Sequence, residues 1–229
     1  MTMLAMGFAS ALHAAEPMHD HGLTMQGHMM DDPVQAFLRA DRLEWQTDGD
    51  RDGAAWEFTS WIGRDANRLW VRAEGDRAGG KTESSEVEAL WGHPVARWWD
   101  VVAGIRQDFA PGPSRSWAAL GLVGMAPYEF DVRLTGYVSA HGATALKMEI
   151  DYDLLLTQRW ILQPRAEATW FGKSDSERDQ QSGVAKSGLG LRLRYELRRE
   201  FAPYVGVEWE RPDNTRGALN FIAGLRAWL

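Results

Sequence analysis

Apolar and polar residues alternate along most of the chain with a period of two. From Pro127 to Ser139, apolar residues and glycine occupy every second position, and mostly charged or polar residues lie between them. The same alternation runs through residues 143–155 and 184–198. A strand places alternate residues on opposite faces, whereas a helix would spread this pattern around its axis. The chain is therefore predicted to be all-β.

Twelve segments of this kind are separated by turn-forming residues. They lie near residues 42–47, 54–62, 67–75, 84–92, 97–108, 115–124, 127–139, 143–155, 158–171, 184–198, 202–210 and 216–229. Several run ten residues or more, which suits tilted strands that cross a bilayer. Connections after odd-numbered segments tend to be long, such as 75–83, and those after even-numbered segments are short, such as 63–66. This alternation predicts a transmembrane antiparallel up-and-down β-barrel of about 12 strands.

Aromatic residues lie mostly near the ends of these segments. They are Trp98, Trp99, Trp117, Tyr128, Trp160, Trp170, Phe171, Phe201, Tyr204, Trp209 and Trp228. Membrane barrels carry aromatic girdles at both interfaces, with the apolar face toward lipid and the polar face toward the lumen. The placement favours such a barrel over a soluble β-sandwich, in which the two faces would be reversed.

Composition narrows the possible functions. The chain has 229 residues, a length that barrels often reach as a single domain. It has no Cys, which excludes disulfides, thiolate zinc sites and a cysteine nucleophile. The formal charge of −7, with no basic cluster, argues against nucleic acid as a partner. A mean hydropathy of −0.39 and the lack of a long apolar run exclude a helical membrane span.

The N-terminal part reads as an export segment followed by a tail. Residues 4–15 are small and apolar, so residues 1–15 are predicted to be a signal peptide, with a short buried helix as the alternative. The usual positively charged start is missing, which indicates a truncated or misplaced start. Residues 16–41 are predicted to be a flexible tail, and residues 42–229 the barrel.

This tail carries seven candidate metal ligands within thirteen residues. They are Met18, His19, His21, Met25, His28, Met29 and Met30. Thioether sulfur suits Cu(I) and imidazole suits Cu(II), so the combination favours copper. Zinc or nickel held by the histidines alone would leave the methionines without a role. An incidental linker is the remaining alternative. Glycines and the lack of periodicity favour a flexible tether over a preformed site.

Several short motifs occur in order along the barrel. They are Trp98-Trp99 followed by Gly104-Ile105-Arg106, then Ala126-Pro-Tyr-Glu-Phe-Asp131, Leu155-Leu-Thr-Gln-Arg159, Leu162-Gln-Pro-Arg165 and Glu200-Phe-Ala-Pro-Tyr-Val-Gly206. From about Arg42 to the C-terminus, the chain resembles the copper resistance protein B family. The resemblance implies an outer-membrane β-barrel of Gram-negative bacteria that contributes to copper resistance.

We therefore expect an outer-membrane barrel that captures or passes copper ions, with its tail in the periplasm. The expected cofactor is copper, as Cu(I) or Cu(II). Expected partners are outer-membrane lipid, copper ions and periplasmic copper-resistance proteins, with no nucleic acid. His93 and Met125 fall in predicted periplasmic turns and are further candidate ligands.

Acidic residues of the seventh and eighth segments have two interpretations. They are Glu129, Asp131, Glu149, Asp151 and Asp153. As lumen groups they would guide a cation, or they would pair with Arg133, Lys147 and other basic groups. Pairing is the stronger expectation.

Two other functions stay open. A passive porin or structural barrel would need no tail. A lipid hydrolase would need a Ser beside a general-base His. Within the predicted barrel the histidines are His93 and His141, both in turns, and an oxyanion-hole motif is not evident. The protein is therefore not expected to be an enzyme.

Overall fold

The computed structural model describes residues 33–49, 51–175, 182–212 and 217–229, which belong to one compact unit. Among them, no helix is long and apolar enough to cross a membrane. The signal peptide predicted at 1–15 and most of the predicted tail fall outside the described residues. The strands are β1 (Gln35–Thr47), β2 (Asp52–Arg64), β3 (Asn67–Ala78), β4 (Lys81–Ala96), β5 (Trp99–Ala110), β6 (Arg115–Ala126), β7 (Phe130–Ser139), β8 (Thr144–Asp151), β9 (Leu154–Leu155), β10 (Trp160–Phe171), β11 (Gly183–Tyr195), β12 (Phe201–Pro212) and β13 (Ala218–Trp228), and a 3-10 turn, η1 (Pro127–Glu129), precedes β7.

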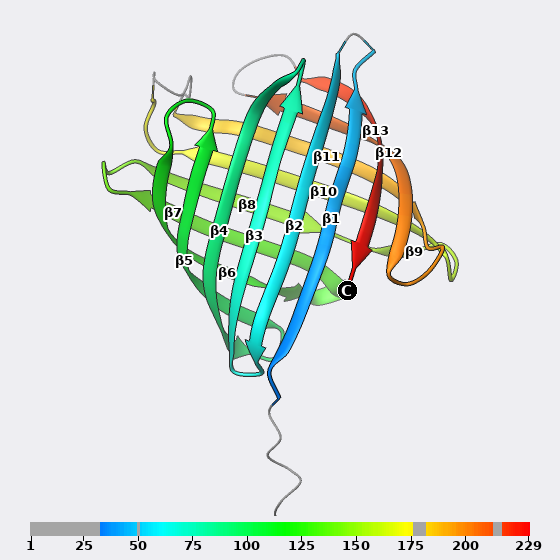
Figure 1. The fold of residues 1–229 in the computed structure, drawn as a ribbon, viewed down its shortest axis with the longest axis horizontal. Helices are drawn as coiled ribbons and strands as arrows, with labels where there is room; N and C mark the ends of the chain where they lie inside the picture. The colour runs from blue at the N-terminus through cyan, green and yellow to red at the C-terminus, as the bar shows by residue number, and fades with distance from the viewer. Residues whose placement is uncertain (1–32, 50, 176–181, 213–216) are drawn as a thin grey trace, which may run out of the picture. The chain divides into compact units, whose positions relative to one another are not determined.

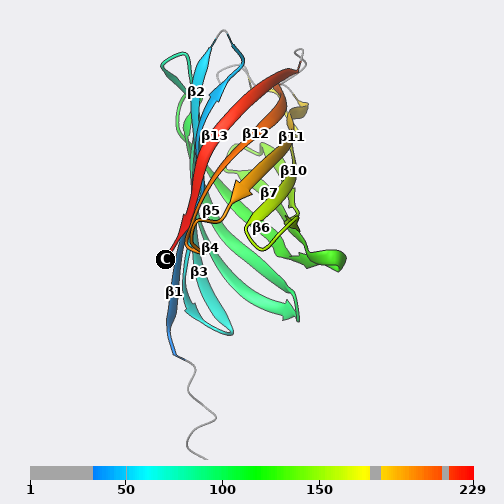
Figure 2. The same cartoon turned by 90° about the vertical axis from the view of Figure 1, so that its right-hand side faces the viewer.

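The strands form one closed antiparallel sheet. Neighbours in the chain are neighbours in the sheet, β10 pairs with both β8 and β11, and β13 returns to pair with β1. Figure 2 shows β13, β12, β11 and β10 following one another around the wall. The described residues thus contain twelve long strands, with the two-residue β9 lying along β10. The predicted fold class, an all-β up-and-down barrel, is confirmed.

Side chains are distributed as in a barrel that crosses a bilayer. The outward Leu120 and Phe221 are 64% and 59% exposed, whereas the inward Glu57 is 2% exposed. An apolar exterior around a polar interior reverses the arrangement of a water-soluble sandwich. The period-two alternation in the sequence therefore corresponds to apolar side chains on the membrane-facing surface and polar side chains on the lumen-facing surface.

The first strand is longer than its predicted range of 42–47. It begins at Gln35, and its register with β2 shifts between Ala40 and Arg42. A bulge of this kind switches the side-chain alternation, because it inserts one extra residue into the strand. Arg39 and Arg42 both line the interior as a result, although they are three positions apart. The switch hides the start of β1 from a period-two reading.

The connection between β3 and β4 is shorter than the predicted loop of 75–83. Only Gly79 and Gly80 separate the two strands, with φ of +55° and +81°. Two consecutive positive φ values suit a tight hairpin turn, which glycine adopts without strain. A register shift between Asp76 and Arg77 breaks the alternation just before the turn. The ladder therefore continues where the sequence predicted a loop.

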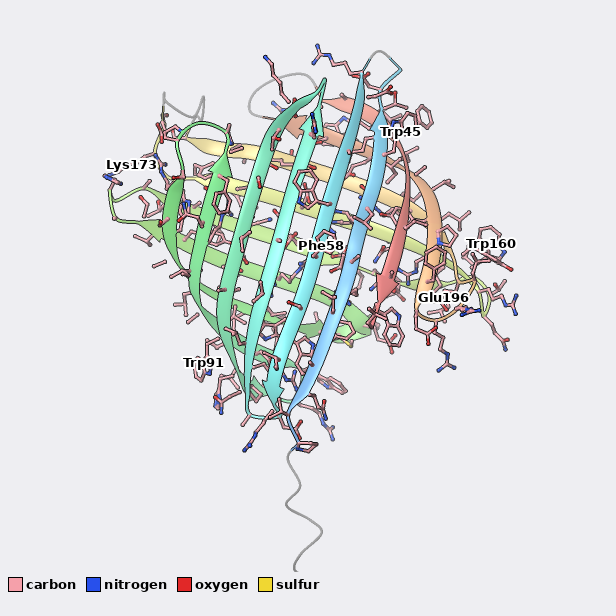
Figure 3. All side chains as sticks on the ribbon, viewed as in Figure 1. Trp45, Phe58, Trp91, Trp160, Lys173 and Glu196 are labelled. Atoms are coloured by element: carbon pink, nitrogen blue, oxygen red, sulfur yellow. The ribbon has the colours of Figure 1, made fainter. Side chains whose placement is uncertain are left out.

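Most of the aromatic residues expected at the interfaces are exposed, but three of them, Trp117, Phe171 and Tyr204, point inward. Figure 3 labels Trp160, which projects from the outside of the barrel together with Trp45 and Trp91. Trp117 and Tyr204 are instead buried. Their polar atoms explain the difference, because a buried indole or phenol takes a hydrogen-bond partner. Trp117 Nε1 donates to Asp108 Oδ2 at 2.8 Å, and the Tyr204 hydroxyl donates to Glu44 at 2.9 Å.

Trp117→Phe should lower the free energy of unfolding by about 1–2 kcal/mol, because it removes the charge-assisted hydrogen bond to Asp108 and some buried surface. Denaturant unfolding of the detergent-folded barrel measures this loss. Trp45→Phe on the exterior is the matched control and should change little. Equal effects of the two substitutions would contradict the inward assignment of Trp117.

Candidate functional site

The centre of the lumen is filled by ion pairs that join opposite walls. Glu57 on β2 accepts hydrogen bonds from Arg133 on β7 and Arg165 on β10, each at 2.9 Å. Arg42 Nε on β1 lies 3.1 Å from the same carboxylate. In Figure 1, β8, β10 and β11 cross behind β1 to β4, so one carboxylate reaches guanidinium groups of the opposite wall.

A second group links β1 to β11 and β12. Arg192 Nε donates to Glu44 at 2.7 Å, and its Nη2 donates to Glu208 at 2.9 Å. Toward the other end of the lumen, Lys186 on β11 lies 2.9 Å from Glu210 and 3.5 Å from Asp76 on β3. These pairs tie the walls together at successive levels.

A second lysine, at the same level of the lumen as Lys186, also bridges opposite strands. Lys147 on β8 contacts Glu74 on β3, and it lies 3.1 Å from Glu86 on β4. The cavity among these groups, Glu57 and Arg133 has a volume of only about 10 Å³. That is about the space of one water molecule, too little for a hydrated ion. We call the Glu57, Arg42, Arg133, Arg165, Glu149, Lys147, Glu74 and Glu86 side chains the central ion layer.

Two larger cavities lie on either side of this layer. The proximal end of the barrel is where β1 begins and β13 ends, and the distal end carries the β1–β2 and β3–β4 turns. The proximal vestibule, of about 440 Å³, has as charged lining Arg39, Asp41, Arg42, Arg68, Arg72, Arg97, Asp100, Asp131, Arg133, Asp151, Arg165, Arg192 and Arg226. The distal vestibule, of about 450 Å³, has Arg42, Asp48, Arg51, Asp52, Glu74, Asp76, Arg77, Glu83, Glu86, Arg106, Asp108, Lys147, Glu167, Lys186 and Glu210.

The acidic residues of the seventh and eighth segments mostly pair, as the stronger interpretation expected. Glu149 accepts from Arg165 at 2.9 Å and lies 3.3 Å from Arg133. Asp151 lies 3.8 Å from Arg133, and Asp153 accepts from Arg194 at 2.7 Å. Glu129, in η1, and Asp131 are exposed. Lys147 differs from the expectation, since it pairs with Glu74 and Glu86 across the lumen.

Three carboxylates of the central ion layer come close enough to hold a cation. Oxygens of Glu57, Glu74 and Glu149 lie within 4.8 Å of one another. Arginine and lysine side chains already neutralise all three. The grouping is explained by ion pairing, because buried carboxylates are stable when paired.

The predicted metal ligands fall into two groups. The tail residues Met18, His19, His21, Met25, His28, Met29 and Met30 lie outside the described residues. His93 and Met125, predicted in turns, lie within β4 and β6 near the proximal end. The β4 ladder continues through His93 and Pro94, which pair with Val101 and Asp100.

Those two residues face opposite sides of the barrel wall. His93 stacks on the outward Trp91, and its Nδ1 lies 2.7 Å from the carbonyl oxygen of Ala66. Met125 lines the proximal vestibule. The structure therefore does not bring them together, and Met125 is the candidate that faces the lumen.

Glu57, Arg165 and Glu44 were not predicted from the sequence as lumen residues. A usable signal existed, since each is a charged residue inside a long alternating segment. Their ion-pair partners could not be predicted from the sequence, because Glu57 and Arg165 are 108 positions apart in the chain.

Comparison with known proteins gives consistent matches. A family model described as "Copper resistance protein B precursor (CopB)" matches residues 34–228. Copper resistance protein B of Escherichia coli is 44% identical over 216 residues, covering 89% of this chain and 73% of that protein. A copper resistance protein B homolog of Pseudomonas syringae pv. tomato is 47% identical over 214 residues, covering 88% and 73%.

The barrel also resembles a solved porin structure. The NanC porin superposes with a TM-score of 0.57 at 10% sequence identity, covering 84% of this chain and 99% of that chain. At such low identity the likeness concerns the fold alone.

Proposed function

The chain belongs to the copper resistance protein B family, and from that premise we propose that it is an outer-membrane barrel that captures copper ions through its N-terminal tail. The observation that carries the proposal is the set of seven thioether and imidazole ligands from Met18 to Met30. Soft thioethers beside imidazoles suit copper in both oxidation states. The chain has no Cys, so these groups and carboxylates are its available ligands.

Several features of the barrel support the outer membrane as its location. Its outward face is apolar along every long strand, which makes membrane lipid its surrounding partner. The predicted tail of residues 16–41 overlaps β1, which begins at Gln35, so its candidate ligands from Met18 to Met30 precede the first strand in the chain. We place the tail in the periplasm, where it would exchange copper with periplasmic copper-resistance proteins. Tethering raises the effective concentration of captured copper at the barrel.

The central ion layer favours capture over free diffusion. A passive porin needs a continuous water-filled lumen, whereas ion pairs here span the lumen between two vestibules. Met125, facing the proximal vestibule, is a further candidate ligand. The proposed role involves no catalysis.

Copper titration of the detergent-folded full chain tests the proposal. We expect saturable binding that is lost when the four tail methionines become Leu and the three tail histidines become Asn. The matched control is Met148→Leu. This methionine lies on β8 between the inward-facing Lys147 and Glu149, so its own side chain faces away from the lumen, and its substitution should leave copper binding unchanged. Equal copper binding by the unsubstituted and tail-substituted proteins would leave a passive or structural barrel as the better explanation.

A further inference from the structure

The two vestibules carry opposite charge. Among the described residues, the proximal lining has nine arginines and four aspartates, and the distal lining has nine carboxylates and six basic residues. A cavity lined by excess charge of one sign concentrates ions of the other sign. The excess of arginine over aspartate therefore favours anions in the proximal vestibule.

One row of inward residues organises the wall of the proximal vestibule. Thr59 on β2 pairs in register with Arg72 on β3 and with Arg39 on β1. The next row toward the proximal end places Trp61 beside Trp70. These residues all line the vestibule. Adjacent strands thus bring a hydroxyl-bearing side chain, guanidinium groups and an indole ring to one region of the wall.

Several of these donors have no partner within the protein. In the described part of the chain, Thr59 Oγ1, Trp70 Nε1 and Arg72 Nε make no hydrogen bond. Thr59 and Arg72 are more than nine-tenths buried. Buried polar groups nearly always find a partner, and leaving one unsatisfied is unfavourable. Three such groups on one wall are explained if a ligand supplies the acceptors.

Two other arginines of the lining are only partly used. Arg165 donates from both Nη atoms to Glu57 and Glu149, while its Nε has no hydrogen-bond partner among the described residues. Arg192 likewise leaves Nη1 without one. Carboxylates of the lumen wall therefore hold both side chains in place without using all of their donors. Fixed guanidinium groups are well suited to oxyanions, because their donors match carboxylate and phosphate geometry.

We propose that the proximal vestibule is a binding site for a small multivalent oxyanion, bearing carboxylate or phosphate groups. The site is enclosed by the barrel wall and lined by inward residues, so a soluble anion reaches it and a lipid headgroup in the surrounding membrane does not. Small side-chain rotations bring the buried donors to the ligand. The site is independent of copper capture by the tail, since it needs no metal.

The test is calorimetric titration of the full chain, freed of metal on a chelating resin, with sodium citrate and with inorganic phosphate. We expect saturable binding that weakens with added sodium chloride. Binding of citrate alone identifies a carboxylate ligand, binding of phosphate alone a phosphate ligand, and binding of both a general oxyanion site. Absence of saturable binding with both probes overturns the proposal.

Variants locate the site. Thr59→Val and Trp70→Phe each remove a donor that makes no hydrogen bond within the described structure, so they preserve the fold. Each should weaken anion binding by about 5-fold to 30-fold. Arg72→Lys, which keeps the charge facing Glu88 but loses the planar fork, should weaken it similarly.

Thr169→Val is the matched control, because it removes a hydroxyl from the distal vestibule and should leave anion binding unchanged. Equal weakening by Thr59→Val and Thr169→Val, or no weakening by Thr59→Val, would contradict the site. Heat-modifiable electrophoretic mobility verifies that each variant has folded. The tail-substituted protein should bind the anion normally, which separates this result from the outcome for copper.

Discussion

Glu57→Ala is expected to lower the free energy of unfolding by about 3–5 kcal/mol, because removing one partner of a buried ion pair leaves uncompensated charge. Three guanidinium groups, those of Arg42, Arg133 and Arg165, converge on this carboxylate. Glu149 and Asp151 offset part of the charge, since they also contact Arg133 and Arg165. The measurement is denaturant unfolding of the barrel in detergent.

Two further variants separate charge from shape. Glu57→Gln keeps the volume and one acceptor oxygen, so its loss should be smaller than that of Glu57→Ala. Glu83→Ala removes an exposed acid at the distal rim of β4, and a change within about 0.5 kcal/mol is expected there. If Glu57→Ala is no more destabilising than Glu83→Ala, the central ion layer does not hold the walls together.

Replacing the four tail methionines with leucine should weaken Cu(I) binding by about 100-fold or more, because each thioether is a soft ligand that leucine cannot replace. Replacing the three tail histidines with asparagine should instead weaken Cu(II) binding most, since imidazole is the ligand that suits it. Titration of the folded full chain with each oxidation state, under reducing or oxidising conditions, measures both effects.

Single substitutions in the barrel complete this comparison. Met148→Leu should change neither affinity. Met125→Leu should weaken Cu(I) binding only if the thioether in the proximal vestibule joins the site. The oxidation-state assignment would be wrong if the methionine and histidine variants lost Cu(I) and Cu(II) affinity in equal proportion. A mixed site, in which methionine and histidine bind the same copper ion, would then be the better explanation.

The strands and their two faces were predictable because alternation is a local property. In the predicted segment 127–139 the alternation holds from Phe130 to Ser139, where Thr135 is buried and Leu134 exposed. Its first three residues instead form the turn η1, in which Tyr128 and Glu129 have positive φ. The bulge in β1 was not predictable in the same way. Ala36 to Leu43 contains apolar residues at both parities, so only pairing with β2 and β13 reveals where the alternation changes.

The lumen contacts were less predictable than the strands. Charged residues could be assigned to the inward face, but their partners depend on which walls meet across the barrel. Lys147 reaches Glu74 and Glu86, 73 and 61 positions away, and not the acids of its own hairpin. The direction of the His93 side chain was also not predictable from the sequence. The neighbouring Leu90 and Trp91 are both apolar, so the alternation does not show whether His93 faces the lumen or the outside of the barrel.

The opposite charges of the two vestibules have a consequence for electrical behaviour. An excess of arginines in the proximal vestibule and of carboxylates in the distal vestibule gives the lumen a permanent dipole along the barrel axis, the direction in which an ion would cross the membrane. A conducting state of this barrel would therefore be a rectifier, passing unequal currents at voltages of equal size and opposite sign. Its polarity in a planar bilayer would report which end faces which compartment.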